Sequence, residues 1–256
     1  MGPDLLLLTI YFICVFYVLY QMARDVENSI DPKVELSLKI DSLVQEVERQ
    51  LDRQGRDDIE VDTVPQKAGA RALMLKFFES GESSNLIGNL TLLVSPQGQQ
   101  TLKPIPGLSV EVTNQKPFTQ VSIDWDNSSL SLLTNQARRV VRHIPGLMMS
   151  LGQPQVHTVV NPNQKVAAVV TSEDSFGRNP DTQVLQPVTP LLDLSRVTGL
   201  PFKGNPTYSL MLLVNIYPTA APHHILQLLI PFQFEIKELP EEPAFFLFRW
   251  LLSFSR

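Results

Sequence analysis

The longest uninterrupted apolar stretch of the chain lies at its beginning. From Leu5 to Tyr20 every residue is apolar or aromatic except Thr9, and no charged residue occurs between Leu5 and Ala23. A helix over this stretch is apolar on all sides, because no polar position recurs at a period of 3.6 residues. Sixteen to 18 residues reach roughly 24 to 27 Å, near the short end of what spans a ~30 Å hydrocarbon core. The pattern predicts a transmembrane anchor over residues 1–23.

Two other interpretations of this stretch have less support. A cleaved signal peptide needs a basic start and small residues at the cleavage site, whereas this chain opens with MGPD and continues into LYQMAR. A buried helix of a soluble domain is the third possibility. An uncleaved signal-anchor is therefore expected, and Arg24, Lys33 and Lys39 on its C-terminal side predict that the bulk of the chain lies on the cytoplasmic side.

The next segment, residues 24–56, is predicted to be an acidic juxtamembrane helix. Asp31 can cap it, Pro32 suits the first helical position, and Gly55 suits the end. Apolar residues recur at spacings of 4, 3, 4 and 4 in a single stripe: Leu36, Ile40, Leu43, Val47 and Leu51. A strand through VELSLKI is the alternative, and the stripe beyond Ile40 favours the helix. The stripe could pack on its own domain or pair with a partner helix as a short coiled coil.

From about residue 57 to 240 the pattern changes to short runs rich in leucine, valine, isoleucine and aromatic residues. Such runs include ALMLKFFE, NLTLLVS, LSVEVTN, TQVSIDW and YSLMLLVNIY, and turn-forming residues separate them. There is no alternation of strands with helices, so a parallel sheet is not expected. The fold class is predicted to be mainly β, with an antiparallel sandwich-like domain, as one unit or as two modules meeting near residues 146–155.

Two segments depart from the β pattern. NQARRVVRHIPG is predicted to be a short helix, since a strand would place arginine and valine on one face. Its Arg138, Arg139 and Arg142 are candidates for gripping lipid phosphates or an acidic partner, and a solvated helix face is the alternative.

The C-terminal residues 241–256 are predicted to form an amphipathic helix with a wide aromatic face. They are too short to span a bilayer, so they could lie in its interface or contact a partner; closure of the protein's own core is the alternative. The candidate contact residues are Phe246, Arg249, Trp250 and Phe254.

The sequence carries no motif for catalysis, metal binding or phosphate binding. The only cysteine, Cys14, lies in the apolar run, and the four histidines do not show ligand spacing. Asp124 and Asp126 share a strand face at a separation that a glycosidase pair could use, but acids of a solvated hairpin are the favoured interpretation. Likewise, the loop TSEDSFGRNPD lacks the spacing of a calcium loop.

Charge and composition narrow the function further. The net charge is −5, and residues 23–63 hold 12 acidic against 6 basic residues, a net of −6. Nucleic-acid binding is not expected from such a chain. We predict a single-pass, membrane-anchored and non-enzymatic accessory, scaffold or assembly factor of a membrane complex, with no cofactor and no metal. The alternatives are a tethered β domain that binds a lipid or other apolar ligand, and a hydrolase with an unrecognised site.

Overall fold

The computed structural model describes residues 3–28, 33–79, 85–133, 136–144, 151–180, 184–197, 205–219 and 225–239. The chain divides into two compact units, of which one comprises Val34–Glu238 and the other comprises Met1–Lys33 with Leu239–Arg256. In the second of these units the described element is helix α1 (Pro3–Asn28). The residues between 146 and 155 lie inside the unit Val34–Glu238.

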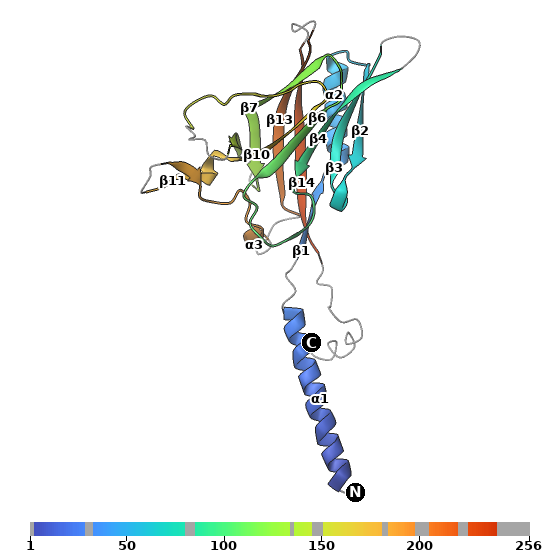
Figure 1. Ribbon diagram of the computed structural model, residues 1–256, viewed down its shortest axis with the longest axis vertical. Coiled ribbons are helices and arrows are strands. Elements are labelled where there is room, and N and C mark those ends of the chain that lie inside the picture. The colour runs from blue at the N-terminus through green and yellow to red at the C-terminus, as the bar shows by residue number, and fades with distance from the viewer. Residues whose placement is uncertain are drawn as a thin grey trace. The chain divides into compact units, whose positions relative to one another are not determined.

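The unit Val34–Glu238 is built on one large antiparallel sheet that curls on itself (Figure 1). The order of its strands is β2-β3-β4-β6-β10-β8-β7-β13-β14-β1-β5, and β9 pairs with β7. The first part of the chain contributes β1 (Lys33–Leu38), β2 (Ile59–Pro65), β3 (Arg71–Phe78), β4 (Leu86–Ser95), β5 (Gly98–Thr101) and β6 (Leu108–Asn114). The later strands are β7 (Thr119–Leu132), β8 (Ala137–His143), β9 (Thr158–Val160), β10 (Gln164–Ser172), β13 (Thr207–Pro218) and β14 (Leu226–Glu238). The predicted mainly β, antiparallel fold class is confirmed.

Smaller elements complete the unit. A separate two-stranded sheet pairs β11 (Phe176–Arg178) with β12 (Leu185–Pro187). Short helical turns occur at η1 (Lys67–Gly69), η2 (Glu173–Ser175) and α3 (Leu194–Val197). The one longer helix described in this unit is α2 (Ile40–Arg53).

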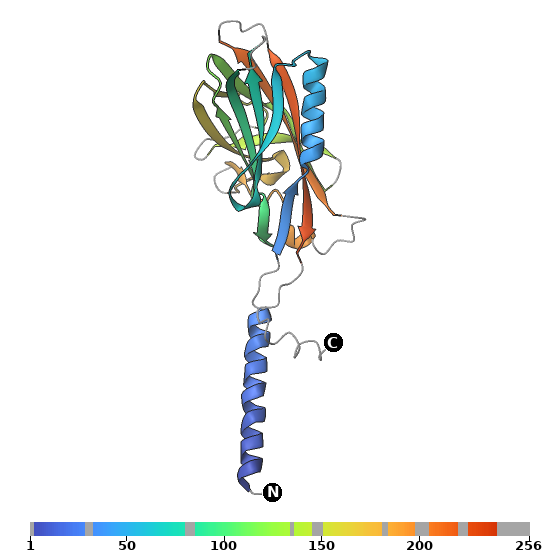
Figure 2. The ribbon, with the colours of Figure 1, turned by 90° about the vertical axis from the view of Figure 1, so that its right-hand side faces the viewer.

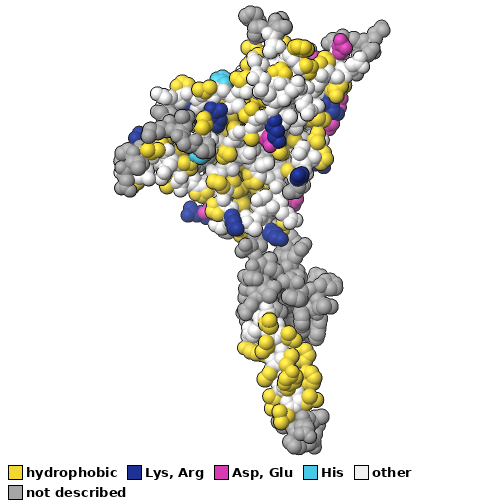
Figure 3. Space-filling view, viewed as in Figure 1, with side chains coloured by type: hydrophobic (Ala, Val, Ile, Leu, Met, Phe, Trp, Pro, Cys, Tyr) yellow, Lys and Arg dark blue, Asp and Glu magenta, His cyan; other side chains and the backbone are white. Residues whose placement is uncertain are grey.

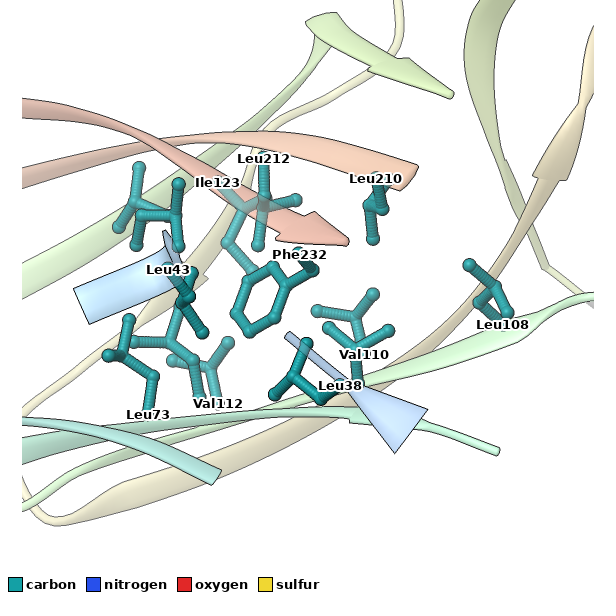
Figure 4. Packing of buried hydrophobic residues seen from close by; sticks show 14 of the residues in the cluster. Leu38, Leu43, Leu73, Leu108, Val110, Val112, Ile123, Leu210, Leu212 and Phe232 are labelled. Carbon is teal, nitrogen blue, oxygen red and sulfur yellow. The ribbon is translucent and has the colours of Figure 1, made fainter. Parts of the chain in front are cut away.

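The hydrophobic core lies between the two sides of the curled sheet. Alternate residues along the strands point inward, as in β13 and β14, where buried and less buried positions follow each other. Figure 4 shows Phe232 and Leu212 from one side of the sheet meeting Val112 and Val110 from the other. The Phe234 and Tyr208 rings stack at 4.9 Å between centroids. Burial of these side chains supplies most of the driving force for the fold.

The prediction of one continuous helix over residues 24–56 is wrong, because a strand lies between the helices Pro3–Asn28 and Ile40–Arg53. Lys33–Leu38 forms strand β1, which pairs with β14 from Val34↔Glu238 to Leu38↔Phe234. The reason is that Val34, Leu36 and Leu38 alternate, so that a strand buries all three. The helix begins only at Ile40, and the rest of the predicted stripe, Leu43, Val47 and Leu51, forms its buried face.

The predicted helix over NQARRVVRHIPG is also wrong. Residues Ala137–His143 form strand β8, which pairs with β7 on one side and β10 on the other. The rejected strand placed arginine and valine on one face, which seemed unfavourable. The structure accommodates that pattern because Arg138 and Arg139 pair with carboxylates of the same chain and Arg142 donates to a hydroxyl.

Helix α2 closes one border of the sheet. It packs between β14 and β2, the strands near the two ends of the curled sheet (Figure 2). Beyond its pairing with β1, strand β14 would expose an unpaired backbone edge, which is unfavourable and prone to aggregation. The Gln50 side chain satisfies this edge, because its Nε2 donates to the Leu229 carbonyl at 2.8 Å and its Oε1 accepts from the Leu229 N–H at 2.9 Å.

Three neighbouring features complete the protection of the β14 edge. The Gln54 Nε2 donates to the Gln227 carbonyl at 2.8 Å, and the Lys39 N–H donates to the Gln233 carbonyl at 2.8 Å. Between these positions stands Pro231, which has no N–H to satisfy. Two glutamines of one helix thus replace the missing neighbour strand.

We expect Gln50→Ala to lower the free energy of unfolding by about 0.5–1.5 kcal/mol, because it removes two hydrogen bonds to the backbone of Leu229 at a partly exposed edge. Urea unfolding of the full chain in a neutral detergent, followed by tryptophan fluorescence, measures this. Gln45→Ala is the matched control, since Gln45 is exposed on the same helix. Equal stability of the two variants would show that the glutamine contacts do not stabilise the edge.

Candidate functional site around the β7 bulge

Strand β7 contains a large irregularity. Asp124 lies opposite Leu213 and Ser129 lies opposite Met211, so residues 125–128 face the single residue Leu212 of β13. Extra residues of this kind form a β-bulge, which bends the strand and redirects its side chains. The bulge coincides with the sequence DWDNSS, whose Asp124 and Asp126 the sequence predicts to be acids of a solvated hairpin. The hairpin interpretation is wrong, since β7 continues to Leu132.

Side chains replace the backbone bonds that the bulge interrupts. Ser128 Oγ donates to the Asp124 carbonyl at 2.5 Å and accepts from the Leu213 N–H at 3.0 Å. The Asp124 carboxylate accepts from the N–H groups of Asp126 and Asn127, each at 3.1 Å, and from Asn127 Nδ2 at 2.7 Å. Asp124 is therefore buried, at 7% exposure, rather than solvated as expected.

Asp126 and Arg139 form the centre of a polar network on the outer side of β7 and β8. Arg139 Nη2 lies 2.5 Å and Nε 3.1 Å from Asp126 Oδ1. Gln155 adds its backbone N–H at 2.7 Å from Oδ2 and its Nε2 at 3.1 Å from Oδ1. Burial disfavours the charged form of Asp126, but the hydrogen bonds from Arg139 and Gln155 together outweigh it and hold the pKa of Asp126 below its usual value.

The same network holds the segment 151–157 on the sheet. Arg139 Nη1 donates to the Leu151 carbonyl at 2.5 Å, and its Nη2 donates to the Gln153 carbonyl at 3.1 Å. Gln155 also bridges to β8, because its Nε2 donates to the Val140 carbonyl and its Oε1 accepts from the Arg142 N–H. We name Asp126, Arg139 and Gln155 the bulge clamp. Its contacts are those of a structural support.

The other two arginines of the predicted cluster are also engaged within their own chain. Arg138 pairs with Asp174 of η2. Arg142 Nη1 donates to Thr158 Oγ1 at 2.6 Å, and the same oxygen accepts from Trp125 Nε1 at 2.8 Å. The Nε of Arg142 is buried without a partner among the described residues. The structure therefore brings the three arginines onto one strand, but each has its contacts within the β domain.

A serine, a histidine and an aspartate also meet beside the bulge. Ser122 Oγ lies 3.4 Å from His157 Nδ1, and His157 Nε2 lies 3.9 Å from Asp124 Oδ1. The second distance is too long for a hydrogen bond, and Asp124 already accepts three others. The cluster thus lacks the carboxylate–imidazole bond that orients the base of a nucleophilic triad. Sequence analysis missed this meeting, because His157 comes from a segment 35 residues away.

Several predicted site residues lie outside the described part of the chain. These are the C-terminal candidates Phe246, Arg249, Trp250 and Phe254; the adjacent histidines His223 and His224, for which no metal site is predicted, lie outside it as well. Asp181 of the weighed calcium loop is in the same position, while Glu173 and Asp174 lie on η2. Among the residues whose placement is described, no group of three or more histidine, cysteine or acidic residues could hold a metal ion.

Helix α1 has side chains described from Leu7 to Met22, and these are largely exposed. The exposed apolar residues follow one another along the helix without a polar side, and the visible face in Figure 3 is mostly apolar and uncharged. Gln21 Nε2 donates to the Tyr17 hydroxyl at 2.9 Å near the C-terminal end. In the described portion of the chain, no helix is both long and apolar enough to cross a membrane.

Comparisons with protein-family models, with curated proteins and with solved structures found no match to this chain. The function is therefore argued from the residues and their geometry.

We expect Asp126→Asn to lower the free energy of unfolding at pH 7 by about 1–2 kcal/mol, because Arg139 loses its charged acceptor. The folded-state pKa of Asp126 is lowered, so its contribution is present above the ordinary aspartate pKa of about 3.9 and disappears as the pH falls through the folded value. Urea unfolding at pH 7 and at pH 3 measures the difference between wild type and variant.

The difference should shrink at the lower pH. Asp57→Asn is the control, because Asp57 is exposed and no ion pair is described for it; it should change little at either pH. A gap between wild type and Asp126→Asn that is the same at both pH values would contradict the role given to the carboxylate.

Proposed function

We propose that this protein is a membrane-anchored, non-enzymatic accessory or scaffold protein, in which α1 tethers a β domain to a bilayer. The observation that carries the proposal is the apolar circumference of α1. Leu7 is 67% exposed, Ile13 is 63% exposed and Phe16 is 60% exposed, and they lie on different sides of the helix. Burying a large apolar side chain is worth roughly 1.5–3 kcal/mol, so water is a poor environment for such a helix.

The described apolar part of α1 is short for a membrane span, so the proposal requires a locally thinned bilayer. The 16 described side chains, Leu7 to Met22, rise about 24 Å, which is less than the ~30 Å of a typical hydrocarbon core. The proposal therefore needs the uncharged flanks, out to Leu5 and Ala23, to lie in lipid as well. A modest mismatch is tolerated at a small cost per ångström.

The basic residues after the apolar run support a cytoplasmic β domain. Arg24, Lys33 and Lys39 follow the run, and no lysine or arginine precedes it. Positive charge near a membrane span is retained on the cytoplasmic side. The proposed orientation puts the residues before the apolar run on the opposite side.

The C-terminal residues are proposed as a second contact with the membrane interface or with a partner. The pairing Val34↔Glu238 means that the chain enters and leaves the β domain at neighbouring positions. Lys33 and Leu239 are neighbours, because the Leu239 N–H donates to the Lys33 carbonyl at 3.1 Å. Aromatic and arginine residues such as Phe246, Arg249, Trp250 and Phe254 are of the kinds that favour an interface.

An accessory role is favoured over the two alternatives by the way the β domain uses its side chains. The polar groups of the bulge region hold the fold together, and the Ser122, His157 and Asp124 distances do not form a working triad. Storage of an apolar ligand would need room between the two sides of the sheet. That interior is filled by large buried side chains such as Phe232 and Phe234.

We expect the full chain to float with liposomes after carbonate treatment and the double variant Ile13→Lys, Phe16→Lys to stay behind. Each central lysine costs about 2.5–3.5 kcal/mol in a membrane helix, which is enough in combination to disfavour insertion. Ile13→Leu, Phe16→Leu is the matched control and should float. Wild-type protein that washes off the liposomes would overturn the anchor.

The accessory role is tested separately by mild detergent extraction followed by cross-linking and size analysis. A defined larger complex is the expected result. A protein that remains solitary under all such conditions would count against an accessory function, whatever the outcome of flotation.

A further inference from the structure

Helix α2 makes different contacts with β14 on one side and with β2 on the other. On the β14 flank, Gln50 and Gln54 bond to the strand backbone and seal the edge. On the β2 flank, α2 also contacts the strand, and an open groove of about 710 Å³ is lined by residues of both elements. Both ends of the sheet are therefore beside one helix, but only one of them is closed.

The groove runs along an unpaired backbone edge. The Phe78 N–H donates to the Asp58 carbonyl at 2.8 Å, so Asp58 faces β3. In an antiparallel ladder successive residues face opposite sides, and the N–H and C=O of Ile59 and Val61 therefore point away from β3. Both residues line the groove, and no partner is described for these outward groups.

The rest of the free edge is already protected, which confines the opening to the groove. The Thr63 N–H donates to the Asp62 side chain at 2.7 Å, and Pro65 has no N–H. These features are typical devices against unwanted strand pairing. Among the outward N–H groups of β2, those of Ile59 and Val61 are the ones for which no partner is described.

The groove is strongly acidic on its walls and apolar at its base. The acidic lining residues are Glu48, Asp52, Asp57 and Glu60. Lys76 partly neutralises Glu60, and the one basic lining residue, Arg56, is held by Asp58 at 2.7 Å. For Glu48, Asp52 and Asp57 no ion pair is described. Leu51, Ile59, Val61 and Phe78 supply the apolar part of the lining.

We propose that this groove binds an extended segment of a partner protein with basic residues at alternate positions, which adds as a strand to β2. The free N–H and C=O groups supply the main-chain bonds of strand addition. Alternate side chains of an added strand point to opposite faces, so apolar residues face the base while lysine or arginine meets the acidic walls. The proposal deepens the accessory role and rests on it, because it gives that role a partner chemistry and a binding surface.

The test uses the full chain in an uncharged detergent and a capped, fluorescein-labelled octapeptide of alternating lysine and valine. Fluorescence anisotropy measures its affinity. The comparison probes are the same peptide N-methylated at alternate residues and a glutamate–valine counterpart. We expect each comparison probe to bind at least about tenfold more weakly, since the first loses main-chain donors and the second is repelled.

Two variants locate the binding. Val61→Pro removes an N–H that makes no hydrogen bond to β3, and the same strand already contains a proline at Pro65. This variant should bind the lysine–valine peptide at least about tenfold more weakly. Glu48→Lys should weaken lysine–valine binding similarly and improve glutamate–valine binding. Asp41→Lys makes the same charge change on α2 outside the groove and should leave both affinities within about twofold.

Equal binding of the N-methylated peptide to the wild-type protein would overturn the proposal, because it would reduce the interaction to charge adsorption. This comparison holds even if Val61→Pro fails to fold. A peptide-independent dimer that Val61→Pro abolishes would also overturn it, by assigning the edge to a second copy of this chain. The membrane anchor is tested separately by liposome flotation. Peptide binding is measured in detergent, so a failure of one experiment does not imply a failure of the other.

Discussion

The β domain depends on satisfying the backbone polar groups at the borders of a sheet that curls but does not close through strands alone. Each unpaired N–H or C=O that is removed from water costs free energy comparable to a lost hydrogen bond. Helix α2 meets this constraint at β14 with two glutamine side chains, while its buried stripe of Leu43, Val47 and Leu51 fills the space beneath it. One short helix therefore supplies both edge protection and part of the core.

The bulge in β7 obeys the same constraint in the middle of the sheet. The Ser128 hydroxyl donates to one backbone group and accepts from another, and the Asp124 carboxylate accepts from two backbone N–H groups, in place of regular pairing. The irregularity then turns Asp126 toward Arg139, and the bulge clamp fixes the segment 151–157 over the outer side of the sheet. Polar residues that resemble catalytic or ligand-binding groups in the sequence thus act as substitutes for backbone pairing.

Two features of the described chain lack a favourable environment within the protein, and both bear on its function. The side chains of α1 that the structure describes are apolar and exposed, which supports the proposal of a lipid environment. The edge of β2 at Ile59 and Val61 is polar and unpaired beside acidic walls, which supports the proposal of an extended basic partner. An accessory protein with one tether and one docking edge is the simplest protein with both features.

Local pattern was sufficient for the mainly β class, the buried stripe of α2 and the apolar character of α1, because these depend on periodicity within a few turns or strands. It failed at Lys33–Leu38, where Leu36 fitted a helical stripe and a strand equally well and the pairing with β14, some 200 residues away, decided the outcome. It failed again at Arg138, Arg139 and Arg142, because the carboxylates and the hydroxyl that accept them come from β7, η2 and β9. The open edge of β2 was equally invisible, since an edge exists only once the order of the strands is known. Long-range pairing creates these sites, and no local periodicity encodes it.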